Sequence, residues 1–516
     1  GRLDRCADDS GHGPAGGPVA GQPLPAQRCS ASPPLPSLVL FTVFAAMQFV
    51  VLLIGMAALV WGGILLHRGG LLAGCLLILT AGSCFGHPFW NMPVGPAPLT
   101  FDRLLLAATV GQYLLLRKFG ATDDKPTGPA EWLLLAFIGV LVFSTFTHNW
   151  QVENKQPAAL LVFFWIMPLA LYWVARNMKL TEQSLWWIWG ALSAFGVYLA
   201  ITAIGEVREM WWLVWPRYIR SPEFEEYFGR GRGPFLNPTG AGIYLTACLA
   251  ATWMWWPRFG RWGKLGLVLL NLLIGAGCYF TLTRSVWMGV ALTAMIVVGF
   301  NLPRIWRWPV VGMATLAGIL VAVIFWDSLL SFKRDKNVSA QDVADSASLR
   351  PIFVAVAWEM FCDRPILGCG FGQYKYQHKY YLSERKYGLN LEKARPYGQH
   401  NTFLALLTQT GLMGAGLFVT LLIAWSRQAW GLWRNLHLAP AARQWGLFFL
   451  AFMASYVING MFHDTSPIPN LNMLLMFFGA ITSSLAAMAT MPRGEQASQS
   501  AEANSEEQPQ LATAGV

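Results

Sequence analysis

Residues 398–425 read GQHNTFLALLTQTGLMGAGLFVTLLIAW, and this stretch decides the fold. An apolar run follows directly on the polar residues Gln399, His400 and Asn401, and it is long enough to cross the core of a bilayer. Ionisable side chains at the edge of hydrocarbon are costly, so they usually mark a functional site. We therefore expect a membrane-spanning helix with a functional histidine at its mouth.

Apolar runs of similar length recur along the chain. The sequence is 55% hydrophobic and 12% charged, about half the charged fraction of soluble domains. We predict spans at 38–66, 69–85, 99–117, 130–147, 157–175, 184–205, 238–256, 263–281, 285–300, 308–326, 402–425, 445–462 and 470–489. Helices satisfy every spanning backbone group internally. The pattern predicts an all-α polytopic membrane protein with about 12–14 transmembrane helices.

The distribution of Lys and Arg predicts how the chain is oriented. Short loops rich in these residues stay in the cytoplasm, and such clusters follow the runs at 99–117, 157–175, 238–256, 285–300 and 402–425. All five fall on one side, together with the C-terminus. Segments 86–98, 148–156, 206–237, 282–284, 327–400 and 463–469 fall on the other. The run 38–66 is one tilted helix or two short ones, which leaves the side of the N-terminus open.

The same pattern divides the chain into five parts. Residues 1–36 are predicted to be a disordered tail, 37–326 carry spans and an Arg-rich outer loop at 206–237, 327–400 form a large extracytoplasmic loop, 401–489 carry three C-terminal spans, and 490–516 form a disordered cytoplasmic tail. Within the large loop we predict a helix at 346–362, with Pro351 in its first turn, and a tight turn at 368–372. Cys362 and Cys369 could pair across this region if it lies outside the cytoplasm.

Arginines at membrane edges suggest an anion site. Arg230, Arg232, Arg284 and Arg350 lie in outer segments, and guanidinium groups suit phosphate geometry. The glycines around Arg230 allow close approach to a ligand, and the helix expected from Pro238 would direct its positive end to the same place. The alternative is that these arginines anchor lipid headgroups.

His400 is the candidate general base, because imidazole titrates near neutral pH. The alternative is that it caps the following helix, a role that Asn401 can also fill. His463 lies in another outer turn and is a weaker candidate. No DxD, HExxH or paired-carboxylate motif occurs in the outer segments, so we expect neither a metal nor a cofactor. Tyrosines in 374–397 fit either an interfacial belt or a sugar-binding surface.

The formal net charge of +10 does not imply nucleic acid as a partner. The basic residues are spread over membrane-edge loops and form no aromatic-basic stripe on a soluble domain.

Four segments, in order, resemble the O-antigen ligase/polymerase superfamily of bacterial membrane glycosyltransferases. They are Arg230-Gly-Arg-Gly-Pro-Phe-Leu-Asn237-Pro238, Thr281-Leu-Thr-Arg284-Ser285, Asp363-Arg-Pro365-Ile-Leu-Gly368-Cys-Gly370-Phe-Gly372-Gln-Tyr and Gln399-His400-Asn401-Thr-Phe-Leu. The large outer loop before the His-Asn segment is also typical of the family. The resemblance covers roughly residues 100–490. Thr239 departs from it, since the family often has Asn there.

The resemblance implies a GT-C-like fold and a metal-independent, inverting glycosyl transfer in the bacterial inner membrane, on its periplasmic side. The donor would be a glycan on undecaprenyl diphosphate, and the acceptor lipid A-core, another glycan or a protein hydroxyl. Arg230 or Arg232 would bind the diphosphate together with Arg284. His400 would activate or orient the acceptor hydroxyl, and Arg350 would hold the loop or the donor. Asn237, Asn401 and His463 would support the site.

A transporter or flippase of lipid-linked or small anionic solutes is the alternative function. Basic outer loops fit it as well, but it would need ionisable groups near the middle of several spans. The central parts of the predicted spans are nearly free of such groups, and no convincing inverted repeat is visible. The sequence does not separate a ligase from a polymerase.

Overall fold

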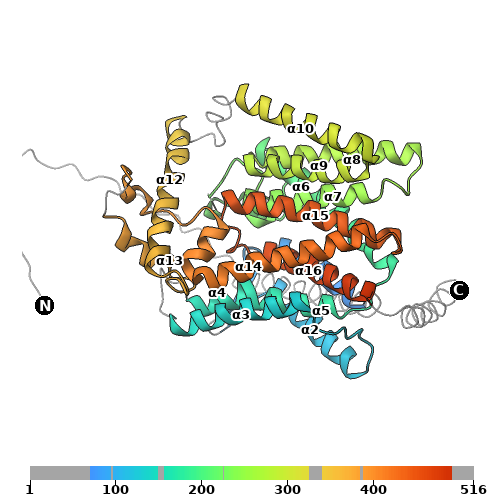
Figure 1. Cartoon of the computed structure of the whole chain (residues 1–516), viewed down its shortest axis with the longest axis horizontal. Helices are drawn as coiled ribbons and strands as arrows, with labels where there is room; N and C mark the ends of the chain where they lie inside the picture. Colours follow the sequence, from blue (N-terminus) through green and yellow to red (C-terminus); the bar gives the residue numbers. More distant parts are fainter. Residues whose placement is uncertain are drawn as a thin grey trace, which may run out of the picture. The chain divides into compact units, whose positions relative to one another are not determined.

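A computed structural model describes residues 70–94, 97–148, 156–224, 226–324, 340–383 and 387–490, and these residues are mostly helical (Figure 1). Three predictions lie outside these residues: the N-terminal tail at 1–36, the first span at 38–66 and nearly all of the tail at 490–516. Every other predicted span coincides with a helix, and this confirms the all-α polytopic fold.

Eight helices of the described residues are long and apolar enough to cross a membrane. They are α3 (Pro129–Thr147), the continuous segment Pro157–Arg176, α6 (Glu182–Val207), α8 (Arg261–Phe280), α9 (Arg284–Asn301), α14 (Thr402–Arg434), α15 (Pro440–Phe462) and α16 (Pro469–Thr490). The segment Pro157–Arg176 comprises α4 (Pro157–Leu161), a π-helical turn (Val162–Ile166) and α5 (Met167–Arg176).

Shorter or less apolar helices stand at the remaining predicted spans. They are Gly70–Gly82, which ends in a π-helical turn (Ile78–Gly82), α2 (Phe101–Lys118), α7 (Pro238–Met254) and α10 (Arg304–Ile324). One small difference from an all-helical chain is the antiparallel hairpin of β1 (Asn91–Val94) and β2 (Ala97–Thr100), in which Asn91 pairs with Thr100.

Helices and 3₁₀ turns occupy the described parts of 206–237 and 327–400, the two segments predicted to be outer loops and called here the first and the large outer loop. The first loop carries the 3₁₀ turns Arg217–Arg220, Pro222–Phe224 and Gly233–Phe235. The second carries α12 (Ala340–Asp363), α13 (Tyr374–Gln377) and the 3₁₀ turns His378–Tyr381 and Leu391–Ala394. Figure 1 shows α12 and α13 at the end of the bundle where α4 lies. The large loop is therefore a small packed unit at one end of the bundle.

The prediction for α12 was partly wrong. The helix begins at Ala340 rather than near 346, so Pro351 lies in its interior and not in its first turn. The helix can propagate through one missing backbone hydrogen bond when the flanking turns are stable. Cys362 is exposed and Cys369 buried, and both are free thiols.

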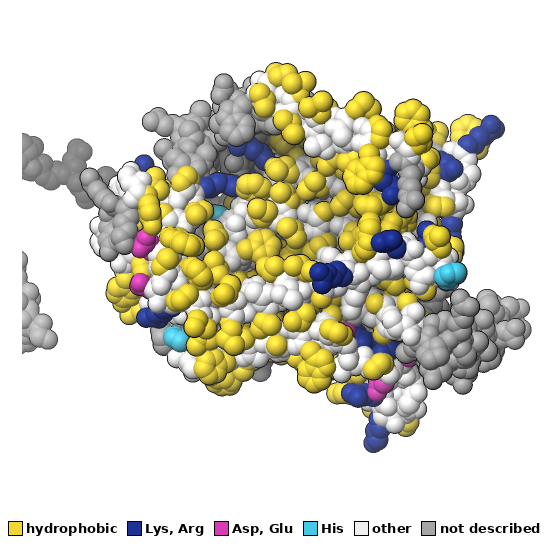
Figure 2. Space-filling model, viewed as in Figure 1, with side chains coloured by type: hydrophobic (Ala, Val, Ile, Leu, Met, Phe, Trp, Pro, Cys, Tyr) yellow, Lys and Arg dark blue, Asp and Glu magenta, His cyan; other side chains and the backbone are white. Residues whose placement is uncertain are grey.

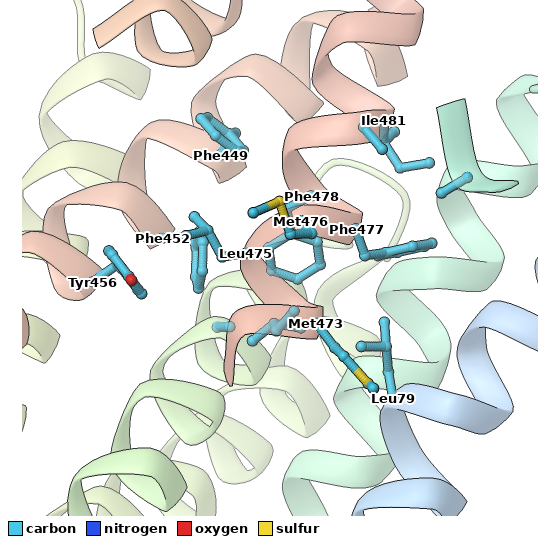
Figure 3. Packing of buried hydrophobic residues seen from close by; sticks show 14 of the residues in the cluster. Leu79, Phe449, Phe452, Tyr456, Met473, Leu475, Met476, Phe477, Phe478 and Ile481 are labelled. Carbon is cyan, nitrogen blue, oxygen red and sulfur yellow. The ribbon is translucent and has the colours of Figure 1, made fainter. Parts of the chain in front are cut away.

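Aromatic rings cluster in the core where α15 meets α16. Phe452 of α15 meets Phe478 of α16 edge-on, with ring centroids 4.8 Å apart, and Phe448 approaches the same ring at 5.1 Å. Figure 3 shows Phe449, Phe452 and Tyr456 on one helix beside Leu475 and Phe478 on the other. The exterior of the bundle differs from this core. Figure 2 shows hydrophobic side chains spread across the face in view, with few charged ones. An apolar exterior around an aromatic core fits a protein solvated by lipid.

Glycines let neighbouring helices touch at the backbone, as is usual inside membranes. A Cβ at Gly446 of α15 would lie 2.3 Å from the carbonyl oxygen of Ala429 and 2.9 Å from the nitrogen of Trp433, both on α14. The spacing of α14 and α15 therefore depends on the missing side chain.

Replacement of Gly446 by alanine should destabilise the protein by about 1–3 kcal/mol, because one methyl group forces two backbones apart. The matched control is Gly431→Ala on α14, where a Cβ meets nothing within 4 Å and alanine favours the helix. Thermal unfolding in detergent measures the difference. Equal melting temperatures for the two variants would contradict this account of the packing.

Candidate functional site

A cavity of about 400 Å³ collects residues from segments far apart in the chain. The first outer loop and the start of α7 contribute Glu226, Tyr227, Arg230, Asn237, Pro238 and Thr239. The large outer loop contributes Gly372, Tyr374, Lys375, Gly398, Gln399 and His400. The turn between α15 and α16 contributes His463, Asp464, Pro467 and Ile468, and the wall is completed by Leu160, Phe164 and Gln409. Four predicted site residues thus share one cavity: Arg230, Asn237, His400 and His463.

Arg230 is held at the cavity wall by the turn before α9. Its Nε donates to the carbonyl of Thr281 at 3.3 Å, and its Nη2 donates to the hydroxyl of Thr283 at 2.6 Å. Only 4% of its surface is exposed. Arg284 follows Thr283 directly as the first residue of α9, so the fold brings the two arginines of the first two motifs together. Arg284 does not itself line the cavity.

Gly231 makes this docking possible. Its N–H donates to the carbonyl of Phe280 at 2.9 Å, and a Cβ at this position would lie 2.7 Å from the Cβ of Ala203. The glycine beside Arg230 thus allows the loop to lie against the bundle.

Arg232 faces away from the cavity. It is 1% exposed, and its Nε lies 3.4 Å from Oε2 of Glu206 on α6. Its remaining nitrogens donate to the carbonyls of Ile219, Phe224 and Glu226. A guanidinium with this many internal partners holds the loop together. Of the two arginines offered as diphosphate ligands, only Arg230 is placed at the cavity.

Three helices begin at this cavity and direct the positive ends of their dipoles toward it. Asn237 caps α7, because its Oδ1 accepts from the N–H groups of Thr239 and Gly240 at 2.9 and 3.0 Å. Asn401 caps α14 in the same way through Phe403 and Leu404, at 2.9 and 3.0 Å. The third helix is α16, which starts just after Ile468. Converging helix starts favour an anion.

A break in α14 sets the position of the segment that carries His400. Gly411 has φ 64° and ψ −165°, which interrupts the helix. The rings of Phe403 and Phe418 lie 6.5 Å apart, whereas a straight helix would separate these residues by about 22 Å. The first part of α14 therefore folds back along the second, and His400 lies two residues before the start of this first part.

The large loop satisfies the backbone groups that this break exposes. Cys369 N donates to the carbonyl of Thr408 at 2.8 Å, and Gly370 N to that of Gln409 at 3.0 Å. In return, Leu412 N donates to the carbonyl of Pro365 at 2.8 Å. Unpaired backbone groups are costly in a membrane. The outer loop is therefore bonded into the helix break through residues 365–370.

Aromatic rings and a charge surround His400. Its ring lies 5.1 Å from the ring of Phe353 and 6.4 Å from that of Tyr397. Burial and the positive charge of Arg350 hold the pKa of His400 below its ordinary value, while Glu226 opposes them. Arg350 lies outside the cavity, with its guanidinium 5.0 Å from the ring of Phe462. The lowered pKa favours the neutral form of the imidazole, which is able to accept a proton.

Asp464 is a carboxyl group that the sequence reasoning missed. Ser466 donates to its Oδ1 through N–H at 3.0 Å and through the hydroxyl at 2.6 Å. Burial raises the pKa of Asp464 to about 6, against the effect of these two hydrogen bonds. Its neighbour His463 is fixed by its backbone, whose carbonyl accepts from the hydroxyl of Thr402 at 3.0 Å. The turn between α15 and α16 thereby adds a titrating group to the cavity.

Glu226, Lys375 and Gln409 are further cavity residues that were not predicted. The acidic run before Arg230 could have indicated Glu226, since it interrupts a basic loop. Gln409 carried no signal, because it reads as part of an apolar helix. Its Oε1 accepts from Gly372 N at 2.7 Å, a contact that exists only through the helix break.

Residues 268–419 match the family model described as O-antigen ligase. This segment contains Arg284, Arg350, His400 and the helix break at Gly411. No curated protein matches the chain. The match supports the resemblance found in the sequence motifs, and it covers part of the 100–490 range expected there.

Replacement of Gly411 by alanine should release the loop from α14 and displace His400. A Cβ would lie 2.2 Å from the carbonyl oxygen of Ile366, in a backbone conformation that favours glycine. We expect faster proteolysis within the outer loop, measured on purified protein. Gly416→Ala is the matched control, because a Cβ there meets nothing within 4 Å. Equal cleavage rates in both variants would contradict the role of the break.

The charges around His400 predict opposite shifts in its titration. Arg350→Gln removes a positive neighbour, stabilises the imidazolium and raises the pKa of His400. For any activity that needs neutral His400, the acid limb of the pH profile should therefore move to higher pH. Glu226→Gln removes a negative neighbour and should move that limb to lower pH. The pH profile of kcat/KM reports these pKa values for the free enzyme. Shifts of the same sign in both variants would exclude His400 as the titrating group.

Proposed function

We propose, from the membership of residues 268–419 in the O-antigen ligase family, that this chain transfers a glycan from undecaprenyl diphosphate to an acceptor hydroxyl. The single observation that carries the proposal is one cavity that holds a buried arginine, a histidine with a lowered pKa and three helix starts. An anionic donor headgroup and a proton acceptor are what such a transfer requires.

The diphosphate of the donor binds near Arg230 and the starts of α7, α14 and α16. Charge develops on the diphosphate oxygen as the bond to the anomeric carbon breaks, and fixed guanidinium and N–H groups stabilise it without reorganisation. Arg284 lies beside Arg230 through the turn Thr281-Leu-Thr283 and contributes a second positive charge. Arg350 holds the loop at His400 and tunes its pKa.

The acceptor hydroxyl loses its proton to His400 as its oxygen attacks the anomeric carbon. The new carbon–oxygen bond forms on the face opposite the departing diphosphate, so configuration is inverted in one displacement. The diphosphate leaves with the electron pair of the broken bond. A neutral imidazole is the form that can take the proton, and its depressed pKa keeps it in that form.

The acceptor is lipid A-core, another glycan or a protein hydroxyl, and the reaction takes place on the periplasmic side of the bacterial inner membrane in a GT-C-like bundle. The positions of basic residues support this orientation. Three basic residues lie near the connection between α14 and α15, away from the cavity: Arg427, Arg434 and Arg443. The positive-inside rule assigns this connection to the cytoplasm.

Transfer should fall by at least about 100-fold in Arg230→Ala, Arg284→Ala and His400→Ala. The assay uses proteoliposomes with a glycan on undecaprenyl diphosphate and a defined acceptor, and thermal unfolding verifies that each variant is folded. Arg217→Ala is the matched control, since Arg217 is an exposed arginine of the same outer loop outside the cavity and should retain activity.

Wild-type transfer in both Arg284→Ala and His400→Ala would refute the proposal. Movement of the intact donor across the membrane without transfer would instead favour the flippase alternative.

A further inference from the structure

A second hollow, of about 500 Å³, lies along α14 and α15. Its α14 side includes Val419, Ile423 and Trp430, and its α15 side Leu450, Met453 and Val457. The positions recur every three or four residues, so each set forms one face of its helix. Both helices are membrane-spanning segments, and Ile423 is 47% exposed. The hollow is therefore a groove that faces lipid.

The groove has the length of one leaflet. Residues 419–430 of α14 cover about 16 Å along the helix, and half of the hydrocarbon core of a bilayer is about 15 Å thick. A single acyl chain of a phospholipid matches this length, whereas a long polyprenyl chain exceeds it.

A positive charge and a hydroxyl mark one end of the groove. Ser426 and Arg427 line it there, and Arg427 is exposed. Within the part of the chain that the structure describes, Arg427 has no hydrogen-bond or ion-pair partner. Arg434 follows on the same helix, with its guanidinium 6.0 Å from the ring of Trp430. An arginine on a lipid-facing surface is costly unless it reaches an anionic partner.

We propose that this groove binds an anionic phospholipid of the cytoplasmic leaflet. Its phosphate bonds to Arg427, and one acyl chain lies between α14 and α15 toward Phe403. Guanidinium suits the phosphate, and the cytoplasmic leaflet is the one rich in anionic lipids. The proposal concerns a lipid site apart from the cavity of His400 and does not depend on the glycan transfer.

Native mass spectrometry of the full chain, extracted from vesicles of equal phosphatidylglycerol and phosphatidylcholine, tests the site. We expect the wild type to retain phosphatidylglycerol selectively. Arg427→Ala should reduce that retention about five-fold, the effect of one arginine at a membrane surface, and Arg427→Lys should restore part of it. Arg261→Ala is the matched control, because Arg261 is an exposed basic residue at the start of α8 and outside the groove.

A second variant tests the groove without changing the charge. Ile423→Trp fills the lipid-facing hollow and should also lower phosphatidylglycerol retention, whereas Leu269→Trp adds the same bulk to the exposed face of α8 and should not. Equal retention of both phospholipids by the wild type would overturn the proposal. So would displacement of bound phosphatidylglycerol by a long-chain polyprenyl phosphate, which would assign the groove to an isoprenoid chain.

Discussion

Backbone hydrogen bonding in a membrane is the constraint on which this structure depends. A helix that breaks inside lipid must find new partners for its exposed groups, and α14 breaks at Gly411. Residues 365–370 supply those partners through Cys369, Gly370 and Pro365. The same bonds place the start of α14, and therefore His400, in the wall of the cavity. The need to satisfy backbone hydrogen bonds within lipid thus sets the position of His400 in the candidate site.

In the first outer loop, one arginine holds the loop in place and another lines the cavity. Arg232 pairs with the buried carboxylate of Glu206 and donates to the carbonyls of Glu226 and Ile219, which fixes the first outer loop. That loop then carries Arg230 to the turn before α9, where it is available to a ligand in the cavity. Arg230 and Arg232 consequently have different roles, although one glycine separates them, because their side chains extend from different sides of the loop.

The cavity is lined by both basic and acidic side chains. Arg230, Lys375 and the helix starts favour an anion, while Glu226 and Asp464 add carboxyl groups, and burial raises the pKa of Asp464 to about 6. The lowered pKa of His400 belongs to the same balance, because burial and Arg350 outweigh Glu226. A wholly basic cavity would bind an anion but would offer little for proton transfer. The mixed lining offers groups suited to both tasks.

The sequence by itself determined the spans, their order and the residue types at the site, because hydrophobic length and the position of Arg and His are local properties of a chain. It predicted spans at 130–147, 263–281 and 445–462, where the structure has α3, α8 and α15, and it singled out Arg230, Asn237, His400 and His463. Only the tertiary structure decided that Arg232 is structural, that Pro351 lies inside α12, and that Glu226, Gln409 and Asp464 reach the cavity. These outcomes depend on contacts between distant segments, above all on the fold-back at Gly411, and no local pattern specifies which backbone groups will meet there.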